Sequence, residues 1–238
     1  MKVAVNSIQQ QTFQGLEVWI IDGNSSDGTQ AYLQSLSAPF QYISEPDMGI
    51  YDAMNKGVQL SQGSWVYFLG SDDQLSSPSI LSYVFQTPYA SSISMLSGKV
   101  TYTQPGIPFI YSKHKKIKSP SWNTSMWIRN GLHHQATFYK KQLFKERLYQ
   151  LKYQVLADYD FNLHAYKSKK QCLLLDHIIA LCSAEGISKS GSKKMYREEF
   201  QLKVAQSSWI FGGFFWILTT LKYLLRKRMN ASASKKEA

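Results

Sequence analysis

The stretch SEPDMGIYDAMNKGVQLSQGSWVYFLGSDD, residues 44–73, decides the fold of this chain. Within it, Ile50, Met54 and Val58 recur at intervals of four, which predicts a helix with these side chains on its buried face. The apolar run SWVYFLG then predicts a buried strand, and two adjacent aspartates follow that strand directly. The chain therefore uses a hydrophobic strand to deliver two carboxylates to one place.

The segments around this stretch complete an α/β pattern. Residues 16–22, 40–45 and 64–70 are short runs rich in strand-forming residues, and helical segments separate them. Strands and helices that alternate at this spacing predict crossover connections and a Rossmann-like, mostly parallel central sheet flanked by helices. Acids follow three successive strands, and we expect them at the edge of the sheet where ligands bind: Asp22, Glu45, Asp47, Asp72 and Asp73.

The pattern in the second half of the sequence predicts that the whole chain divides into two parts of unequal size. Strand patterns cover residues 91–103 and 172–183, and a helical pattern covers 157–170. We expect a catalytic domain over residues 1–191, followed over 192–238 by a charged helix, a membrane-associating helix and a basic tail.

Composition favours a globular protein with an anionic partner. The 238 residues are 44% hydrophobic, the formal net charge is +11 and the isoelectric point is about 9.5. A nucleic acid, a phosphorylated substrate or an acidic membrane leaflet would each satisfy this charge. Cys172 and Cys182 lie in one apolar run, which favours thiols in a core and a reducing cytoplasm over a disulfide.

The end of the chain carries a short amphipathic segment, WIFGGFFWILTTLKYLLRKR. Thirteen residues from Trp209 to Leu221 lack charge, whereas a membrane-spanning helix needs about 20 apolar residues. Tryptophans at its start and the basic residues 226–228 at its end favour a helix that lies in a membrane interface. A buried helix or a helix that docks on a partner protein is the alternative.

The paired carboxylates at 72–73 suit a hard cation. Mg²⁺ and Mn²⁺ prefer oxygen ligands, and Mg²⁺ is usually held by one or two carboxylates together with substrate phosphates. The alternative is that SDD only caps the helix predicted to begin near Pro78.

Five motifs in order carry a family resemblance: VWIIDGNSSDGT, SEPDMGIYDAMNKG, GSWVYFLGSDD, HHQATFYKK and ADYDFNLHA. Together they resemble the family 2 glycosyltransferases, inverting enzymes with a GT-A fold that build bacterial surface polysaccharides. The resemblance covers residues 3–183 and is closest to the branch with an E-x-D-x-GIYDAMNKG segment. It implies metal-dependent transfer of a sugar from a nucleotide-diphosphate sugar to a hydroxyl of a glycan or lipid-linked acceptor. With the charged tail, it implies an enzyme on the cytoplasmic face of the inner membrane.

The resemblance also implies roles on the donor side. Asp22 would contact the nucleobase, Asp73 would bind Mg²⁺ or Mn²⁺, and Asp72 would bind the ribose or sugar. Asp47 would lie near the sugar or phosphates, and Lys56 is a weaker candidate for the phosphates. An Asx turn for Asp22, a helix cap for Asp47 and a solvated side chain for Lys56 are the alternatives.

On the acceptor side, the resemblance makes Asp158 the general base. Asp160 is two residues on, about 200° around a helix, so we expect a structural role for it. His134 and Gln135 match a pair that lines the acceptor side, with a buried structural histidine as the alternative.

Two departures from the family pattern stand out. His164 occupies a position where the family usually has an arginine, which puts an ion pair in doubt. The chain also begins inside the helix that follows the family's first strand, so a central strand is missing. We expect a start assigned too far downstream; a decayed, catalytically impaired membrane-bound copy is the alternative.

Two other function classes fit less well. A nucleotidyltransferase would normally show a glycine-rich phosphate loop, and none is visible. A nucleic-acid-binding module would interleave basic and aromatic residues over one surface, whereas here the basic residues concentrate in separate runs. We therefore expect no nucleic-acid partner.

Overall fold

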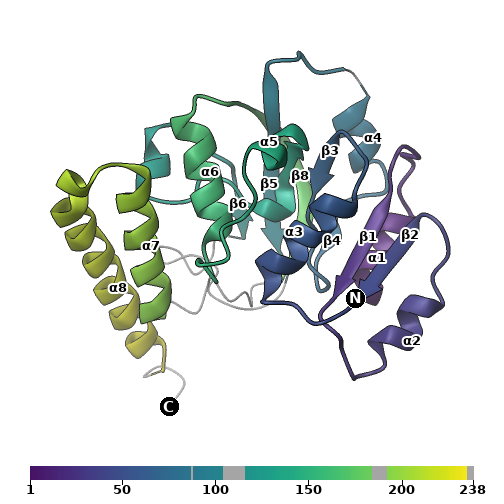
Figure 1. The fold of residues 1–238 in the computed structure, drawn as a ribbon, viewed down its shortest axis with the longest axis horizontal. Helices are drawn as coiled ribbons and strands as arrows, with labels where there is room; N and C mark the ends of the chain where they lie inside the picture. The colour runs from purple at the N-terminus through teal and green to yellow at the C-terminus, as the bar shows by residue number, and fades with distance from the viewer. Residues whose placement is uncertain (87, 104–115, 184–191, 235–238) are drawn as a thin grey trace.

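The computed structural model describes residues 1–86, 88–103, 116–183 and 192–234 of the chain (Figure 1). The elements follow in this order: α1 (Lys2–Gln9), β1 (Val18–Asp22), α2 (Thr29–Gln34), β2 (Phe40–Ser44), α3 (Ile50–Leu60), β3 (Trp65–Tyr67), β4 (Gln74–Leu75), α4 (Ile80–Phe85), β5 (Ile93–Tyr102), β6 (Ile117–Lys118), η1 (Thr124–Trp127), η2 (His134–Ala136), β7 (Thr137–Lys140), α5 (Gln142–Glu146), α6 (Ala157–Lys167), β8 (Gln171–Cys182), α7 (Lys193–Gln206), η4 (Trp209–Phe211) and α8 (Gly212–Ser234).

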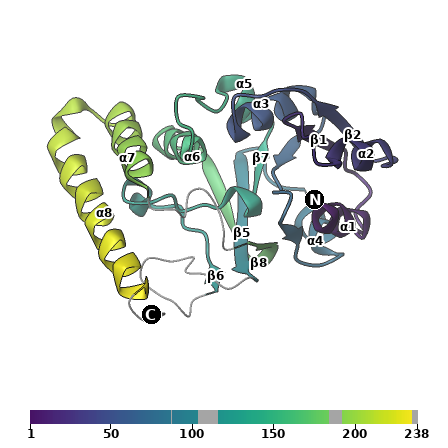
Figure 2. The ribbon, with the colours of Figure 1, turned by 90° about the horizontal axis from the view of Figure 1, so that it is seen from below.

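A six-stranded sheet forms the centre of the molecule, with helices on both faces (Figures 1 and 2). Its strand order is β3-β7-β5-β8-β4, and β6 pairs with β5. Met95 and Tyr139 pack with α3, α5 and α6 on one face, whereas the next residues along, Leu96 and Phe138, pack with α4 on the other. This alternation is the period of two that a strand buried on both faces requires. The predicted α/β class with a flanked central sheet is confirmed.

Strand directions differ from the mostly parallel sheet predicted. β1 and β2 are parallel, as expected, and β5 and β8 are parallel, but the pairs β3–β7, β5–β7, β5–β6 and β4–β8 are antiparallel. β3 takes β7 as its neighbour, and β1 and β2 form a two-stranded sheet of their own. The hydrophobic pattern locates a strand but does not name the neighbour with which it shares hydrogen bonds, and this explains the difference.

A central cavity of roughly 1310 Å³ separates the two sheets. Ile20 and Ile21 of β1 line it, and so do Trp65, Val66 and Tyr67 of β3. Residues of α1 line it as well. β1 and β3, which line this cavity, are therefore not hydrogen-bonded to each other. The expectation that the start of the protein was assigned too far downstream stays a prediction.

The buried face of α3 is shifted by one residue from the predicted face. Val58 is buried as expected, but Ile50 is half exposed, and Tyr51 and Asn55 are buried instead. Asn55 donates to the carbonyl of Tyr149 at 3.0 Å and accepts from its amide at 3.0 Å. Polar side chains with such partners can replace apolar ones at an interface, because each buried polar group is satisfied.

The C-terminal helices α7 and α8 lie side by side at one end of the molecule (Figures 1 and 2). α7 packs against α6, so it adjoins the central domain directly. In the part of the chain that the structure describes, no helix is long and apolar enough to cross a membrane. The predicted domain boundary near Gly191 and the tail residues 235–238 lie outside the described residues.

Neither cysteine forms a disulfide, as predicted. Cys182 is buried and Cys172 is partly buried on the same strand, β8.

Candidate active site

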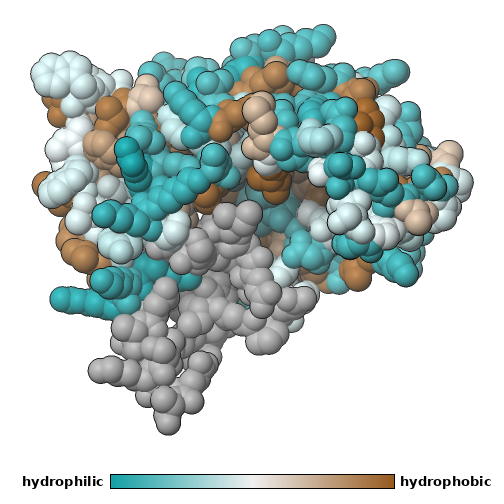
Figure 3. Space-filling view, turned by 60° about the horizontal axis from the view of Figure 1, so that its bottom comes forward, coloured by the Kyte–Doolittle hydropathy of each residue, from teal (hydrophilic) through white to brown (hydrophobic). Residues whose placement is uncertain are grey.

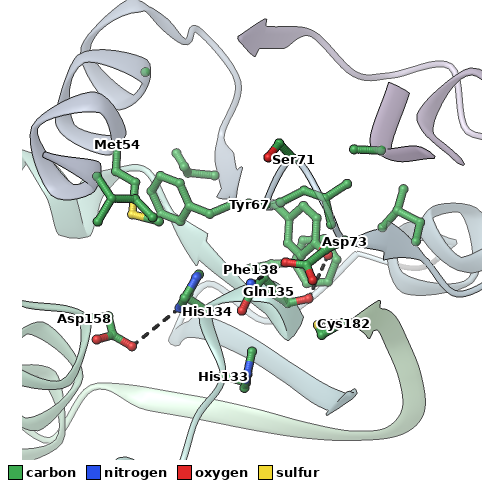
Figure 4. Close-up of a pocket in the computed structure, with 18 of the residues that line it drawn as sticks. Met54, Tyr67, Ser71, Asp73, His133, His134, Gln135, Phe138, Asp158 and Cys182 are labelled. Atoms are coloured by element: carbon green, nitrogen blue, oxygen red, sulfur yellow. Dashed lines mark hydrogen bonds and ion pairs between the residues drawn. The ribbon is translucent and has the colours of Figure 1, made fainter. Parts of the chain in front are cut away.

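Five of the residues predicted for the site line the central cavity, and Figure 4 labels all of them except Asp72. The loop after β3 contributes two carboxylates, η2 contributes two neighbouring polar side chains, and the first turn of α6 contributes a third carboxylate. These residues are Asp72, Asp73, His134, Gln135 and Asp158.

Asp73 is held tightly at one side of the cavity. It is only 2% exposed; its Oδ1 accepts a hydrogen bond from the amide of Ser183 at 3.0 Å, and its Oδ2 accepts one from Nε2 of Gln135. A Cβ on Gly70 would lie 2.5 Å from Oδ2, so the carboxylate requires a glycine there. Burial raises the pKa of Asp73 above its usual value, and the charge of Asp72 adds to this, although the Ser183 amide opposes them.

The pair Asp72 and Asp73 fits a divalent cation whose set of ligands is completed by a substrate. Each carboxylate oxygen has two lone pairs, so an oxygen that accepts one hydrogen bond can still bind a metal. Asp72 is exposed to solvent beside Asp73. Among the described residues, no group of three or more His, Cys, Asp or Glu side chains could hold a metal. A cation here would therefore take its remaining ligands from water or from substrate phosphates.

Asp158 lies on the other side of η2, at the start of α6 (Figure 4). Its Oδ1 accepts a hydrogen bond from the Tyr51 hydroxyl at 2.9 Å, and its Oδ2 accepts one from Nδ2 of Asn130 at 3.1 Å. Nδ1 of His134 lies 3.6 Å from Oδ2. Burial raises the pKa of Asp158, but His134 and the Tyr51 hydroxyl outweigh it, so the pKa lies below its ordinary value. The carboxylate is thus ionised at neutral pH and can accept a proton.

The short helix η2 connects these two carboxylates. Its consecutive residues diverge, because His134 lies beside Asp158 whereas Gln135 donates to Asp73. The side chains predicted for the acceptor side therefore lie between the predicted metal ligand and the predicted base.

Asp22 and Asp47 lie together at the ends of β1 and β2. Asp22 accepts hydrogen bonds from the amide of Ser25 at 3.0 Å and from the hydroxyl of Ser44 at 2.6 Å. Asp47 lies against the residue after Asp22, since a Cβ on Gly23 would be 2.8 Å from its Oδ2. Neither carboxylate is among the residues that line the central cavity. Their donor roles stay predictions.

Lys56 contacts acids rather than the cavity. Its Nζ lies 2.8 Å from Oε1 of Glu45 and 3.7 Å from Asp52, and it donates to the carbonyl of Pro46 at 2.9 Å. These contacts connect α3 to the loop after β2. They do not test the predicted role of Lys56 in binding the phosphates, which stays a prediction.

Asp160 has the structural role that its position on the helix predicted. It is 1% exposed, forms an ion pair with Arg147 at 2.5 Å and accepts a hydrogen bond from Gln206 at 2.7 Å. Arg147 thus supplies the cationic partner of Asp160.

Two cavity residues, Tyr51 and Asn130, escaped the sequence analysis, and a third, Lys118, stood out there only as part of a basic run that is either solvated or faces an anion. Tyr51 and Asn130 orient Asp158, and Lys118 lines the cavity while its ammonium donates to the carbonyl of Leu132 at 3.4 Å. Burial lowers the pKa of Lys118 to about 8. Tyr51 stands inside the decisive stretch, but nothing in a sequence shows that its hydroxyl reaches a residue more than a hundred positions away.

Comparisons with known proteins identify the family. A family model described as "Glycosyl transferase family 2" matches residues 1–148. The "PGL/p-HBAD biosynthesis glycosyltransferase" of Mycobacterium bovis is 26% identical over 189 residues, which cover 75% of this chain and 69% of that protein.

Solved structures share the fold. Residues 1–349 of Staphylococcus aureus TarS, in complex with UDP, superpose with a TM-score of 0.62 at 17% identity, over 86% of this chain. The chain spans 60% of that structure. The mannosyltransferase PcManGT from Pyrobaculum calidifontis, in complex with GDP-Man and Mn²⁺, superposes with a TM-score of 0.60 at 14% identity, over 98% of this chain and 71% of that one. Because the family model matches more than half of the chain and these folds agree with it, the chain belongs to glycosyltransferase family 2.

Proposed function

We propose that this protein transfers a sugar from a nucleotide-diphosphate sugar to a hydroxyl of a glycan or lipid-linked acceptor, with inversion, in the synthesis of a cell-surface polysaccharide. One observation carries the proposal. A hydrogen-bonded, ionised carboxylate, Asp158, and the pair Asp72 and Asp73 line the same cavity, with His134 and Gln135 between them.

The reaction needs one proton acceptor. Asp158 takes the proton of the acceptor hydroxyl as the oxygen forms its bond to the anomeric carbon. The bond between that carbon and the diphosphate oxygen breaks on the opposite side, and the nucleoside diphosphate leaves with the electron pair. Attack from the side opposite the leaving group inverts the anomeric centre.

Asp72 and Asp73 would hold Mg²⁺ or Mn²⁺. The metal would supply positive charge to the departing diphosphate. The Mn²⁺ in the mannosyltransferase complex supports this, as do the oxygen ligands of the pair. The UDP and GDP-Man in the two structural neighbours support a uridine- or guanosine-based donor.

The experiment compares Asp158→Asn with wild type in a transfer assay that contains Mn²⁺ and a panel of nucleotide sugars. We expect the variant to lose about 10²- to 10⁴-fold in kcat, because a general base contributes roughly that factor, and to retain nucleotide-sugar binding. Asp176→Asn is the matched control, since Asp176 is 89% exposed and pairs only with Lys99 among the described contacts. Wild-type turnover by Asp158→Asn would refute the assignment.

A further inference from the structure

The segment from η4 through α8 exposes many large apolar side chains. Exposure ranges from 48% for Leu224 to 82% for Trp209. Brown, apolar side chains lie along the edge of the molecule that carries this helix, at the left of Figure 3. We name this set the α8 outer face; it comprises Trp209, Ile210, Phe211, Phe214, Trp216, Ile217, Leu221, Leu224 and Leu225.

α8 is amphipathic, but its apolar side faces away from the rest of the protein. At about 100° per residue, Phe214, Ile217 and Leu221 fall on one side of the helix. Thr219, Lys222 and Arg226 fall on the opposite side, where they are buried or half-buried against the rest of the protein. A helix at a water-facing surface normally has its apolar side inward and its polar side outward. α8 instead turns an apolar side outward, and its inward side combines these polar residues with the buried Phe215.

Specific contacts fix this orientation. Lys222 forms an ion pair with Glu199 of α7, and Glu199 also pairs with the buried Lys203 at 2.5 Å. Phe215 stacks on Trp127 with ring centroids 6.1 Å apart. To turn its apolar side inward, the helix would have to break the contact between Lys222 and the buried Glu199 carboxylate and unstack Phe215 from Trp127.

Charge identifies what covers the outer face. Residues 209–234 contain no acidic side chain, and the end of α8 carries the exposed Lys227 and Arg228. A cationic, tryptophan-bearing helix with an apolar side is the pattern of segments that lie in the interface of an anionic bilayer. The helix is about 35 Å long, but the described helices include none that could cross a membrane, so it fits a position parallel to the surface.

We propose that the α8 outer face binds the surface of an anionic phospholipid bilayer, with its apolar side chains at the acyl boundary and Lys227 and Arg228 at the headgroups. This inference rests on the helix alone and holds whether or not the transfer reaction is assigned correctly.

The test is flotation of the full chain with vesicles of phosphatidylcholine alone and of phosphatidylcholine mixed with phosphatidylglycerol. We expect binding to the anionic vesicles that weakens as salt is raised. Ile217→Glu/Leu221→Glu should abolish flotation, whereas Met48→Glu, a 74% exposed position outside the α8 outer face, should float like wild type.

A second variant keeps the proposal testable if the first fails to fold. Lys227→Ser/Arg228→Ser leaves the apolar side intact, and we expect it to bind anionic vesicles roughly 10- to 30-fold more weakly. Equal flotation of both variants and wild type would overturn the proposal. The proposal would also be overturned if the wild-type protein did not bind vesicles but formed a dimer through these residues in sedimentation velocity. That result would assign the α8 outer face to contact with a second copy of the chain.

Discussion

Tyr51 links the decisive stretch to the proposed base. Its hydroxyl lies within hydrogen-bond distance of Oδ1 of Asp158 and of the carbonyl of Val155. Tyr51→Phe removes a donor that lowers the pKa of Asp158, so this pKa should rise. As the pH falls, the variant base is protonated earlier. We therefore expect the acid limb of the kcat/KM profile to move to higher pH, with activity at the acid end reduced about tenfold or more, since a hydrogen bond to a charged group contributes roughly 1.5–3 kcal/mol.

Tyr159→Phe is the matched control for this change. Tyr159 follows Asp158 directly in sequence, but its hydroxyl donates to the carbonyl of Met126, at 2.7 Å, and not to Asp158. This variant should lose similar stability and keep the wild-type acid limb. An unchanged profile in Tyr51→Phe would contradict a positioning role for Tyr51.

Gly70 sets the position of the proposed metal ligand. Because a Cβ would lie 2.5 Å from Oδ2 of Asp73, Gly70→Ala must displace that carboxylate. We expect weaker binding of Mn²⁺ with a nucleoside diphosphate, measured by calorimetry, and a stability loss of about 1–3 kcal/mol. Gly213→Ala, where a Cβ meets no atom within 4 Å, should bind like wild type and gain stability. Equal affinity in the two variants would argue against Asp73 as a metal ligand.

At the scale of elements, α7 supports the loop before the base. The Glu198 carboxylate accepts hydrogen bonds from three successive amides, those of residues 154–156, at 2.9 to 3.2 Å. Glu198→Ala leaves these amides without their acceptor, so we expect a loss of about 1–3 kcal/mol in urea unfolding together with a lower kcat. Glu146→Ala removes a more exposed carboxylate paired with Lys170 and should cost at most about 1 kcal/mol. Full activity in Glu198→Ala would show that the loop holds its shape without α7.

The two sheets should differ in local stability. β5 and β8 have hydrogen-bonded neighbours on both sides, whereas β1 pairs only with β2 among the described strands. The amides of β1 that point away from β2 have no ladder partner there, so we expect them to exchange with deuterium at least about tenfold faster than those of β5. Exchange mass spectrometry on the free protein checks this. Equal protection would mean that another segment covers the β1 edge.

The position of a helix or strand in the sequence was easier to predict than the segments that it packs against or pairs with. The helix over 50–60 and the strands β1, β2, β5 and β8 agree with the sequence patterns, since each depends on the periodicity of its own residues. The buried side of α3 was misplaced because Tyr51 and Asn55 are buried through distant polar partners. Strand directions were mispredicted for the same reason: pairing is decided between segments.

At the scale of the whole molecule, motifs located the chemistry but not its supports. Asp72, Asp73, His134, Gln135 and Asp158 meet in one cavity, although they are spread over 87 positions of the chain, from 72 to 158. Asp22 and Asp47 lie close to each other, as their places after two neighbouring strands predicted, but neither is among the residues that line this cavity. Asn130 lies in a segment with no recognisable pattern, and the basic run that contains Lys118 does not show that this side chain reaches the cavity, so only the assembled fold brings the two to the site.

The neighbouring residues Glu198 and Glu199 of α7 contact two different parts of the molecule, which matters for the design of variants. One carboxylate faces the loop before Asp158, and the next fastens α8 through Lys222. We therefore expect that α8 can be replaced by another helix that keeps Lys222 and Phe215 without a change in the position of Asp158. We do not expect this of α7, because it contacts both α8 and the loop before Asp158.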